Sequence, residues 1–190
     1  MKVLKIIGFV ILAIVVVFGV VVALQPAQGH VEKSMVINAA PSVVYAQLNS
    51  FKTFTAWAPW AKMDPDAKYT FEGPESGVGA KMSWESKKIG KGSQWIAESE
   101  EDKRIKNGLS FDGFDGTAYA EFVLAPEGDG TKITWTYDGA NPGVTGKAMW
   151  VFMRGALASQ YDQGLSDLKK MVERTPAPPV TNDKIGRAHV

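Results

Sequence analysis

Residues 1–24 are almost continuously apolar. From Leu4 to Leu24 the run "LKIIGFVILAIVVVFGVVVAL" is broken only by Lys5 and two glycines. A helix needs about 20 apolar residues to cross a bilayer, whereas the apolar core of a secretion signal usually has about 7–15. The pattern therefore predicts a transmembrane anchor in residues 1–24. Removal as a signal sequence, with Val21-Val22-Ala23 as the cleavage site, stays open as the alternative.

The basic residues around this segment predict its orientation. Lys2 and Lys5 lie at its start, and the next basic residue, Lys33, follows it. Positive charges stay on the cytoplasmic side of a membrane helix. We therefore expect a single-pass protein that meets the membrane through residues 4–24, with a cytoplasmic N-terminus. The rest of the chain would be periplasmic or extracellular, joined to the anchor by a linker at 25–30.

Beyond the linker, the pattern changes to short alternating segments that are typical of strands. Residues 31–38 predict a first strand, and the proline start at Pro41 predicts short helices before the next one. Turn sequences such as "GPESGVG", "KIGKG" and "PEGDG" separate the remaining segments. The expected later strands are 68–72, 79–87, 91–99, 103–112, 116–125 and 130–138.

The last ordered segment has a helical pattern. Apolar and small residues recur from Met149 to Val172 with a period of 3.6, which predicts one long amphipathic helix over 146–174. A curved antiparallel sheet must bury its concave face, and this helix has enough apolar surface to cover it. The expected fold is α+β, with the domain spanning 31–174.

Residues 175–190 are expected to form a disordered tail because "TPAPPVTND" is rich in proline. The final "IGRAHV", residues 185–190, is what one reading frame of a common sequencing adapter encodes. We therefore leave it out of the fold prediction.

Several motifs carry a resemblance to a known family. They are "WAPW" followed by "DP", "GPESGVGAKMSWES", "GDGTKITWTYDG" and the terminal "GLSDLKKMVE". With the order of elements, they resemble the polyketide cyclase/dehydrase branch of the START/Bet v1-like (SRPBCC) superfamily over residues 31–173. The resemblance implies a helix-grip fold with an apolar cavity between sheet and long helix. Members bind lipids, polyketides, hormones or other apolar molecules, and only some are enzymes.

Strand alternation suggests which side chains could line such a cavity. The candidates are wide apolar residues beside alanines, and they could equally well fill a closed core. Of the two tryptophans around Pro59, one is expected to pack as a corner and the other to reach a ligand. The candidates are Trp57, Trp60, Met82, Trp84, Trp95, Leu109, Phe111, Phe122, Trp135, Met149 and Met153.

Residues for catalysis are scarce. The chain has no cysteine, and its two histidines are His30, in the expected linker, and His189, in the expected tail. This argues against His–Cys metal sites, cysteine nucleophiles and Ser-His-Asp triads. No metal or cofactor is expected, and an enzyme is not favoured. Arg104 and Tyr119 are further candidates for contacting a polar group on a ligand, although they lie off the apolar strand faces.

The charge pattern argues against nucleic acid as a partner. The formal net charge is +1, and it becomes slightly negative once the charged residues of the two ends are left out. Nucleic-acid binding depends on clustered Lys and Arg, and the chain has no basic block.

The resulting hypothesis is a membrane-anchored protein that binds a hydrophobic small molecule or lipid. A polyketide cyclase/dehydratase-like enzyme and an accessory module that binds an unknown protein are the alternatives.

Overall fold

A computed structural model describes residues 2–114 and 116–174. The expected tail, including residues 185–190 and His189, lies outside the described residues. Helices and strands follow in the order α1 Lys2–Ala23, β1 Gln28–Ile37, α2 Pro41–Leu48, α3 Phe51–Trp57, α4 Pro59–Met63, β2 Lys68–Glu72, β3 Lys81–Ser86, β4 Gly90–Glu100, β5 Arg104–Phe111, β6 Ala118–Glu127, β7 Gly130–Ala140 and α5 Gly143–Arg174.

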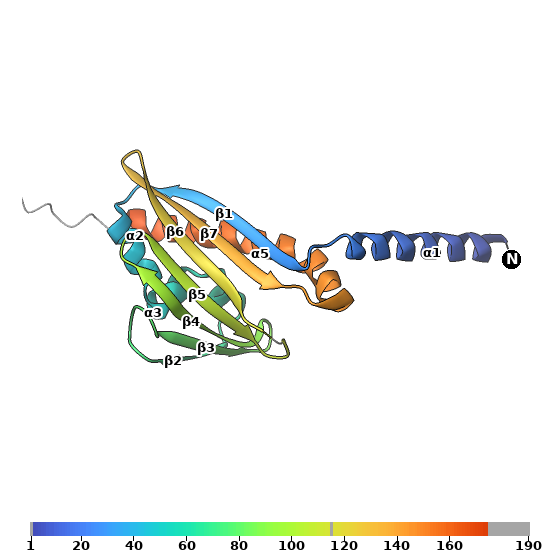
Figure 1. The fold of residues 1–190 in the computed structure, drawn as a ribbon, viewed down its shortest axis with the longest axis horizontal. Helices are drawn as coiled ribbons and strands as arrows, with labels where there is room; N and C mark the ends of the chain where they lie inside the picture. The colour runs from blue at the N-terminus through green and yellow to red at the C-terminus, as the bar shows by residue number, and fades with distance from the viewer. Residues whose placement is uncertain (1, 115, 175–190) are drawn as a thin grey trace, which may run out of the picture.

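The strands form one antiparallel sheet of 7 strands in the order β1-β7-β6-β5-β4-β3-β2. Neighbours from β2 to β7 are consecutive in the chain, and β1 closes the order by pairing with β7 (Figure 1). Inward residues such as Ile105, Phe122 and Ile133 are buried, and their strand neighbours are more exposed. The predicted α+β helix-grip arrangement, with a sheet packed against a long C-terminal helix, is confirmed.

Prolines determine where the short helices begin and end. Pro41 and Pro59 occupy the first turns of α2 and α4, where the missing N–H costs no hydrogen bond. The residue before a proline disfavours helical angles, so Ala58 is extended and separates α3 from α4. These three helices close one end of the sheet.

Helix α5 lies along the concave side of the sheet, and among the strands it contacts β1 most extensively. Its buried residues, among them Tyr161, Leu165 and Leu168, form one stripe toward the sheet. An ion pair of 2.6 Å between Lys33 and Asp162 links helix and strand.

The last turns of α5 also bind the outer edge of β1. Lys169 Nζ donates to the carbonyl of Val36 at 2.6 Å, and the backbone N–H of Asn38, just past the strand, donates to Glu173 at 2.9 Å. The end of α5 therefore covers this part of the sheet edge.

Helix α1 extends away from the domain (Figure 1). It has 22 residues and is therefore about 33 Å long, which is enough by length and composition to cross a membrane. Strand β1 already begins at Gln28, so half of the expected linker 25–30 belongs to the sheet. There, His30 Nδ1 lies 2.8 Å from Asp138 Oδ1 of β7. Four residues, 24–27, connect α1 to β1.

Candidate functional site: the concave face of the sheet

An aromatic cluster fills the concave face at the end closed by α3 and α4. The rings of Trp135 and Tyr161 stack with centroids 3.8 Å apart, and Phe122 and Trp57 lie 4.8 and 5.6 Å from Trp135. All four side chains are almost completely buried. This end of the interior is therefore a packed core. Burial in it raises the pKa of the Tyr161 phenol well above its usual value.

Gly164 lets α5 approach this cluster closely. A Cβ at position 164 would lie 2.9 Å from a ring carbon of Trp135 and 3.2 Å from Pro59. Real Cβ atoms almost never come so close to another carbon, so the position is shaped for glycine.

The two tryptophans around Pro59 have different surroundings. Trp57 is buried, and its N–H donates to the carbonyl of Gln47 at 3.3 Å. Trp60 is half-buried over Trp135, and its N–H donates to Gln160 of α5 at 2.8 Å. Trp57 therefore packs as a corner, and Trp60 covers the cluster from outside.

The "DP" that follows these tryptophans fixes the corner into β2. The Asp64 carboxylate accepts a hydrogen bond of 2.5 Å from Ser86 Oγ. This bond is the main reason that the pKa of Asp64 is lowered. The role of Asp64 here is structural.

The opposite end of the concave face is less covered. Trp84 and Phe111 meet edge to face at 5.8 Å across Gly92, which pairs with both residues in the sheet. Trp84, Phe111 and the neighbouring Leu109 are only half-buried, whereas Met82 is buried one step further in. Apolar side chains therefore extend from the packed core to an open margin.

The first half of helix α5 is also exposed. Residues 152–156 are all exposed, which is more than one full turn. Met149, Met153 and Gln160 share one helix face, and Gln160 binds Trp60 on α4. The two methionines therefore lie on the side of α5 where α4 lies, with 36% and 47% of their surface exposed.

Polar groups are buried in the same concave face. Gln94 and Asn107 are on the inward sides of β4 and β5 and are almost fully buried. Asn107 Oδ1 and Trp135 Nε1 have no hydrogen-bond partner among the described residues. Leaving such a group unpaired costs about 1–3 kcal/mol, which raises the question of what they bind.

The structure corrects the expected orientation of Trp95. It lies on the opposite face of β4 from Gln94 and Ile96, and its indole packs over Gly108 of β5. Arg104 and Tyr119 also face outward: Arg104 pairs with Glu98 and Glu121, and the Tyr119 ring lies 4.9 Å below Lys106 Nζ. None of these three side chains lies on the concave face.

Comparison with known proteins decides the family. Residues 28–173 match the family described as polyketide cyclase / dehydrase and lipid transport. The chain belongs to this family. No curated protein sequence matches the chain.

Solved structures show the same fold. SA2116 from Staphylococcus aureus, of unknown function, is 13% identical over 80% of this chain and 97% of its own, with a TM-score of 0.61. MLL2253 from Mesorhizobium loti is 16% identical over 78% and 100%, with a TM-score of 0.59. Ara h 8.0201 is 10% identical over 78% and 99%, with a TM-score of 0.53.

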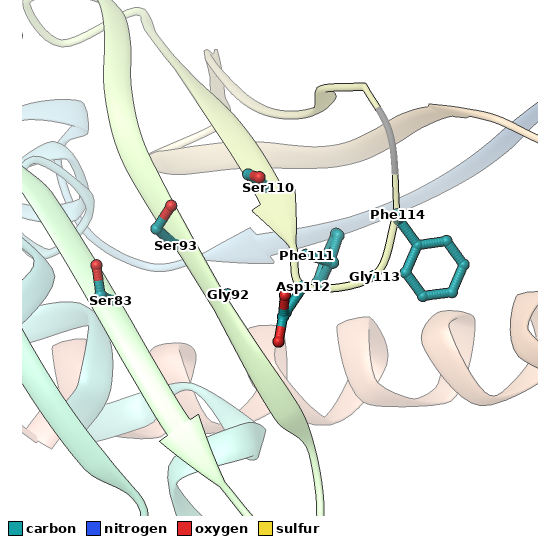
Figure 2. Close-up of a pocket in the computed structure, with 8 residues that line it drawn as sticks. All are labelled: Ser83, Gly92, Ser93, Ser110, Phe111, Asp112, Gly113 and Phe114. Carbon is teal, nitrogen blue, oxygen red and sulfur yellow. The ribbon is translucent and has the colours of Figure 1, made fainter.

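This member of the polyketide cyclase/dehydrase family also has a hollow on the convex face of its sheet (Figure 2). Ser83, Ser93 and Ser110 stand in register across β3, β4 and β5. With the loop from Phe111 to Phe114 they border a hollow of 540 Å³. Alternation places each serine outward, but their alignment depends on strand register, which alternation within single strands does not predict.

Within the described residues, no group of three or more His, Cys, Asp and Glu side chains could hold a metal ion. On the concave face the polar groups described above are amides, an indole and phenols. The phenol of Tyr137, like that of Tyr161, has its pKa raised by burial. These groups can bind a polar atom through hydrogen bonds but are poorly suited to transferring protons at neutral pH.

Proposed function

We propose that this chain is a membrane-anchored binding protein that holds a hydrophobic small molecule or lipid between its sheet and α5. The observation that carries the proposal is the uneven cover of the concave face. One end is a packed aromatic core, whereas Trp84, Leu109 and Phe111 are only half-buried at the other. Met149 and Met153 of α5 are exposed, and their flexible side chains adapt to varied apolar shapes, so we propose that they contact the same ligand.

The buried polar atoms suggest what kind of molecule fits. Asn107 Oδ1 can accept a hydrogen bond and Trp135 Nε1 can donate one, and both lack a partner among the described residues. Asn107 shares the inward side of β5 with Leu109 of the open margin, so an apolar ligand with a hydroxyl group or an ordered water could satisfy its Oδ1, whereas Trp135 Nε1 lies within the packed end. We therefore propose that the ligand is amphipathic and that its polar group points inward, away from the open margin.

The proposed site consists of ten candidates from the sequence, without Trp95. Trp57, Phe122 and Trp135 form its floor at the packed end, and Trp60 covers that floor from outside. Met82 is buried between this floor and the open margin, and the margin itself is proposed to consist of Trp84, Leu109, Phe111, Met149 and Met153.

Helix α1 supports a membrane location, with its N-terminus proposed to be cytoplasmic and the domain periplasmic or extracellular. The connection of four residues spans at most about 14 Å. The domain would therefore stay beside the bilayer, where apolar molecules concentrate.

Native mass spectrometry of the full chain, released from lipid nanodiscs, tests the binding proposal. The wild type should carry an extra mass that denaturing extraction identifies as a lipid or similar amphipathic molecule. Met153→Trp should lose most of this mass because the larger ring fills the margin. Val123→Trp, at an exposed apolar position on the convex face, is the control and should retain it. An empty wild-type protein would contradict the proposal.

A further inference from the structure

The first part of α5 lies at the end of the domain where α1 leaves it (Figure 1), and it exposes large apolar side chains. Val144 is 76% exposed and Phe152 is 70% exposed, beside Met153. Water is a poor surrounding for such a cluster, so an apolar surface that covers it would be favourable.

This part of α5 is held against α1. The rings of Phe18 and Phe152 lie 5.8 Å apart, and Val22 of α1 is buried. Lys147 Nζ donates to the carbonyl of Ala23, the last residue of α1, at 3.4 Å. The start of α5 is therefore packed on the last turns of α1.

The chain between them is fixed as well. The backbone N–H of Asn141 donates to the carbonyl of Ala27 at 2.8 Å, and its side-chain amide donates to Pro26 at 3.4 Å. Two of the four connecting residues, Pro26 and Ala27, are thus bonded to the corner between β7 and α5. Such a corner keeps the domain in one orientation relative to α1.

The position of Phe18 in α1 indicates how deep Phe152 would lie in a bilayer. It precedes Ala23, the end of α1, by five residues, which is about 7.5 Å along a helix. If α1 lies in a bilayer, Phe152 reaches a level below the end of the span. Amphipathic surface helices bury their apolar face by about 5–10 Å, so the two depths agree.

The charges of the segment fit an anionic surface. From Gly143 to Tyr161 the helix contains Lys147 and Arg154 and no acidic residue. Basic side chains near a membrane surface are attracted to acidic lipid headgroups by about 1 kcal/mol each.

We propose that residues 144–154 of α5 form a docking surface that inserts Val144, Phe152 and Met153 into the outer leaflet of the bilayer in which α1 is anchored. This inference rests on the proposed membrane location of α1. It adds that the domain lies against the membrane, with the open margin at Met153 directed toward lipid, so that a ligand can enter without crossing water.

Spin labels on single cysteines test this proposal, since the native chain has no cysteine. The full chain is reconstituted in vesicles of phosphatidylcholine and phosphatidylglycerol. Labels are placed by Val15→Cys in α1, Val144→Cys and Phe152→Cys in the docking surface, and Ser159→Cys. Ser159 is exposed and lies two turns beyond Phe152 on the same helix face, so it is the matched control. Collision with oxygen, which is enriched in lipid, is compared with collision with an aqueous nickel complex.

The ratio of oxygen to nickel collisions should be several-fold higher at positions 144 and 152 than at 159. Val144→Cys leaves Phe152 in place, so a perturbed Phe18 contact cannot explain its result. A lipid-buried label at 15 together with water-exposed labels at 144 and 152 would overturn the docking surface and leave the anchor intact. A water-exposed label at 15 would overturn both. Short label–label distances between two copies at 152 would assign the surface to a second chain and also overturn the proposal.

Discussion

Two glycines of α5 show how one residue type can have opposite effects within a single helix. Gly155 lies in an exposed turn, where an added Cβ would meet no atom within 4 Å, whereas Gly164 faces Trp135 and Pro59. Glycine in a helix costs about 1 kcal/mol relative to alanine. At position 164 the loss of helix propensity is offset by packing, because a larger residue would hold the helix away from the aromatic cluster.

We expect Gly155→Ala to raise the free energy of unfolding by up to about 1 kcal/mol. Gly164→Ala has the same gain in helix propensity, but overpacking a tight core costs about 1–3 kcal/mol, so the net effect should be destabilising. Urea unfolding of both variants in detergent measures the difference. If Gly164→Ala were as stabilising as Gly155→Ala, the inference that α5 has no room for a Cβ beside Trp135 would be wrong.

Alternation along a strand predicts the orientation of single side chains where the strand has one clearly apolar side. Met82, Phe122 and Trp135 are buried on the concave face, as alternation suggests. The prediction that Trp95 faces inward is wrong, because β4 places Gln94 and Ile96 inward and leaves the tryptophan outside. The Trp95 ring packs over Gly108 of β5, where the neighbouring strand has no side chain. The sequence of β4 alone does not show that this space exists.

Among the elements, α4 depends most on side-chain bonds, because it has five residues. Gln160 of α5 accepts the Trp60 N–H, and its amide lies 3.6 Å from Met63 Sδ. Lys62 adds an ion pair of 2.6 Å with Asp167. A short helix of this kind has little stability of its own, so these bonds hold it on α5.

Gln160→Ala should therefore loosen α4 and lower the free energy of unfolding by about 1 kcal/mol, the net value of a typical hydrogen bond. The tryptophan fluorescence of the chain, to which six tryptophans contribute, should shift to longer wavelength as the Trp60 ring becomes more exposed. Ser159→Ala, next to it on the exposed side, should change stability by less than about 0.5 kcal/mol. Equal effects of the two substitutions would show that the bond to Trp60 contributes nothing.

The elements themselves were largely predictable. Alternation and turn sequences indicated seven strands, and the 3.6-residue stripe indicated the long helix, at nearly the observed positions. The start of β1 was missed because Gln28, Gly29 and His30 have no strand-like alternation. Gly29 is required there by Trp150 of α5, whose ring occupies the space of a side chain, and this contact spans most of the chain.

At the scale of the whole molecule, the buried phenol of Tyr161 links folding to alkaline pH. Burial raises its pKa well above the usual value, with further contributions from Tyr137 and Asp138. In the unfolded chain the phenol ionises near pH 10, whereas in the folded protein it stays neutral. Its stabilising effect is therefore complete below about pH 10 and is lost as the pH rises beyond that value.

Unfolding by urea at a series of pH values from about 9 to 11 should show this loss in the wild type. Tyr161→Phe keeps the ring stack and removes the ionisable group, so its stability should fall less steeply. Tyr119→Phe is the control, because Tyr119 is exposed on the convex face and lies outside the aromatic cluster. An unchanged slope in Tyr161→Phe would mean that this phenol is not shielded.

The two edges of the sheet have one more consequence. The last turns of α5 cover the end of β1 through Lys169 and Glu173. At the other edge, β2 has five residues, ends at Glu72 and is followed by Gly73-Pro74. Unprotected strand edges recruit further strands and promote aggregation. Proteins confined to a membrane meet one another often, in two dimensions. With α1 anchored as proposed, one edge partly covered by a helix and one edge too short to template a partner would let many copies crowd on one membrane without polymerising.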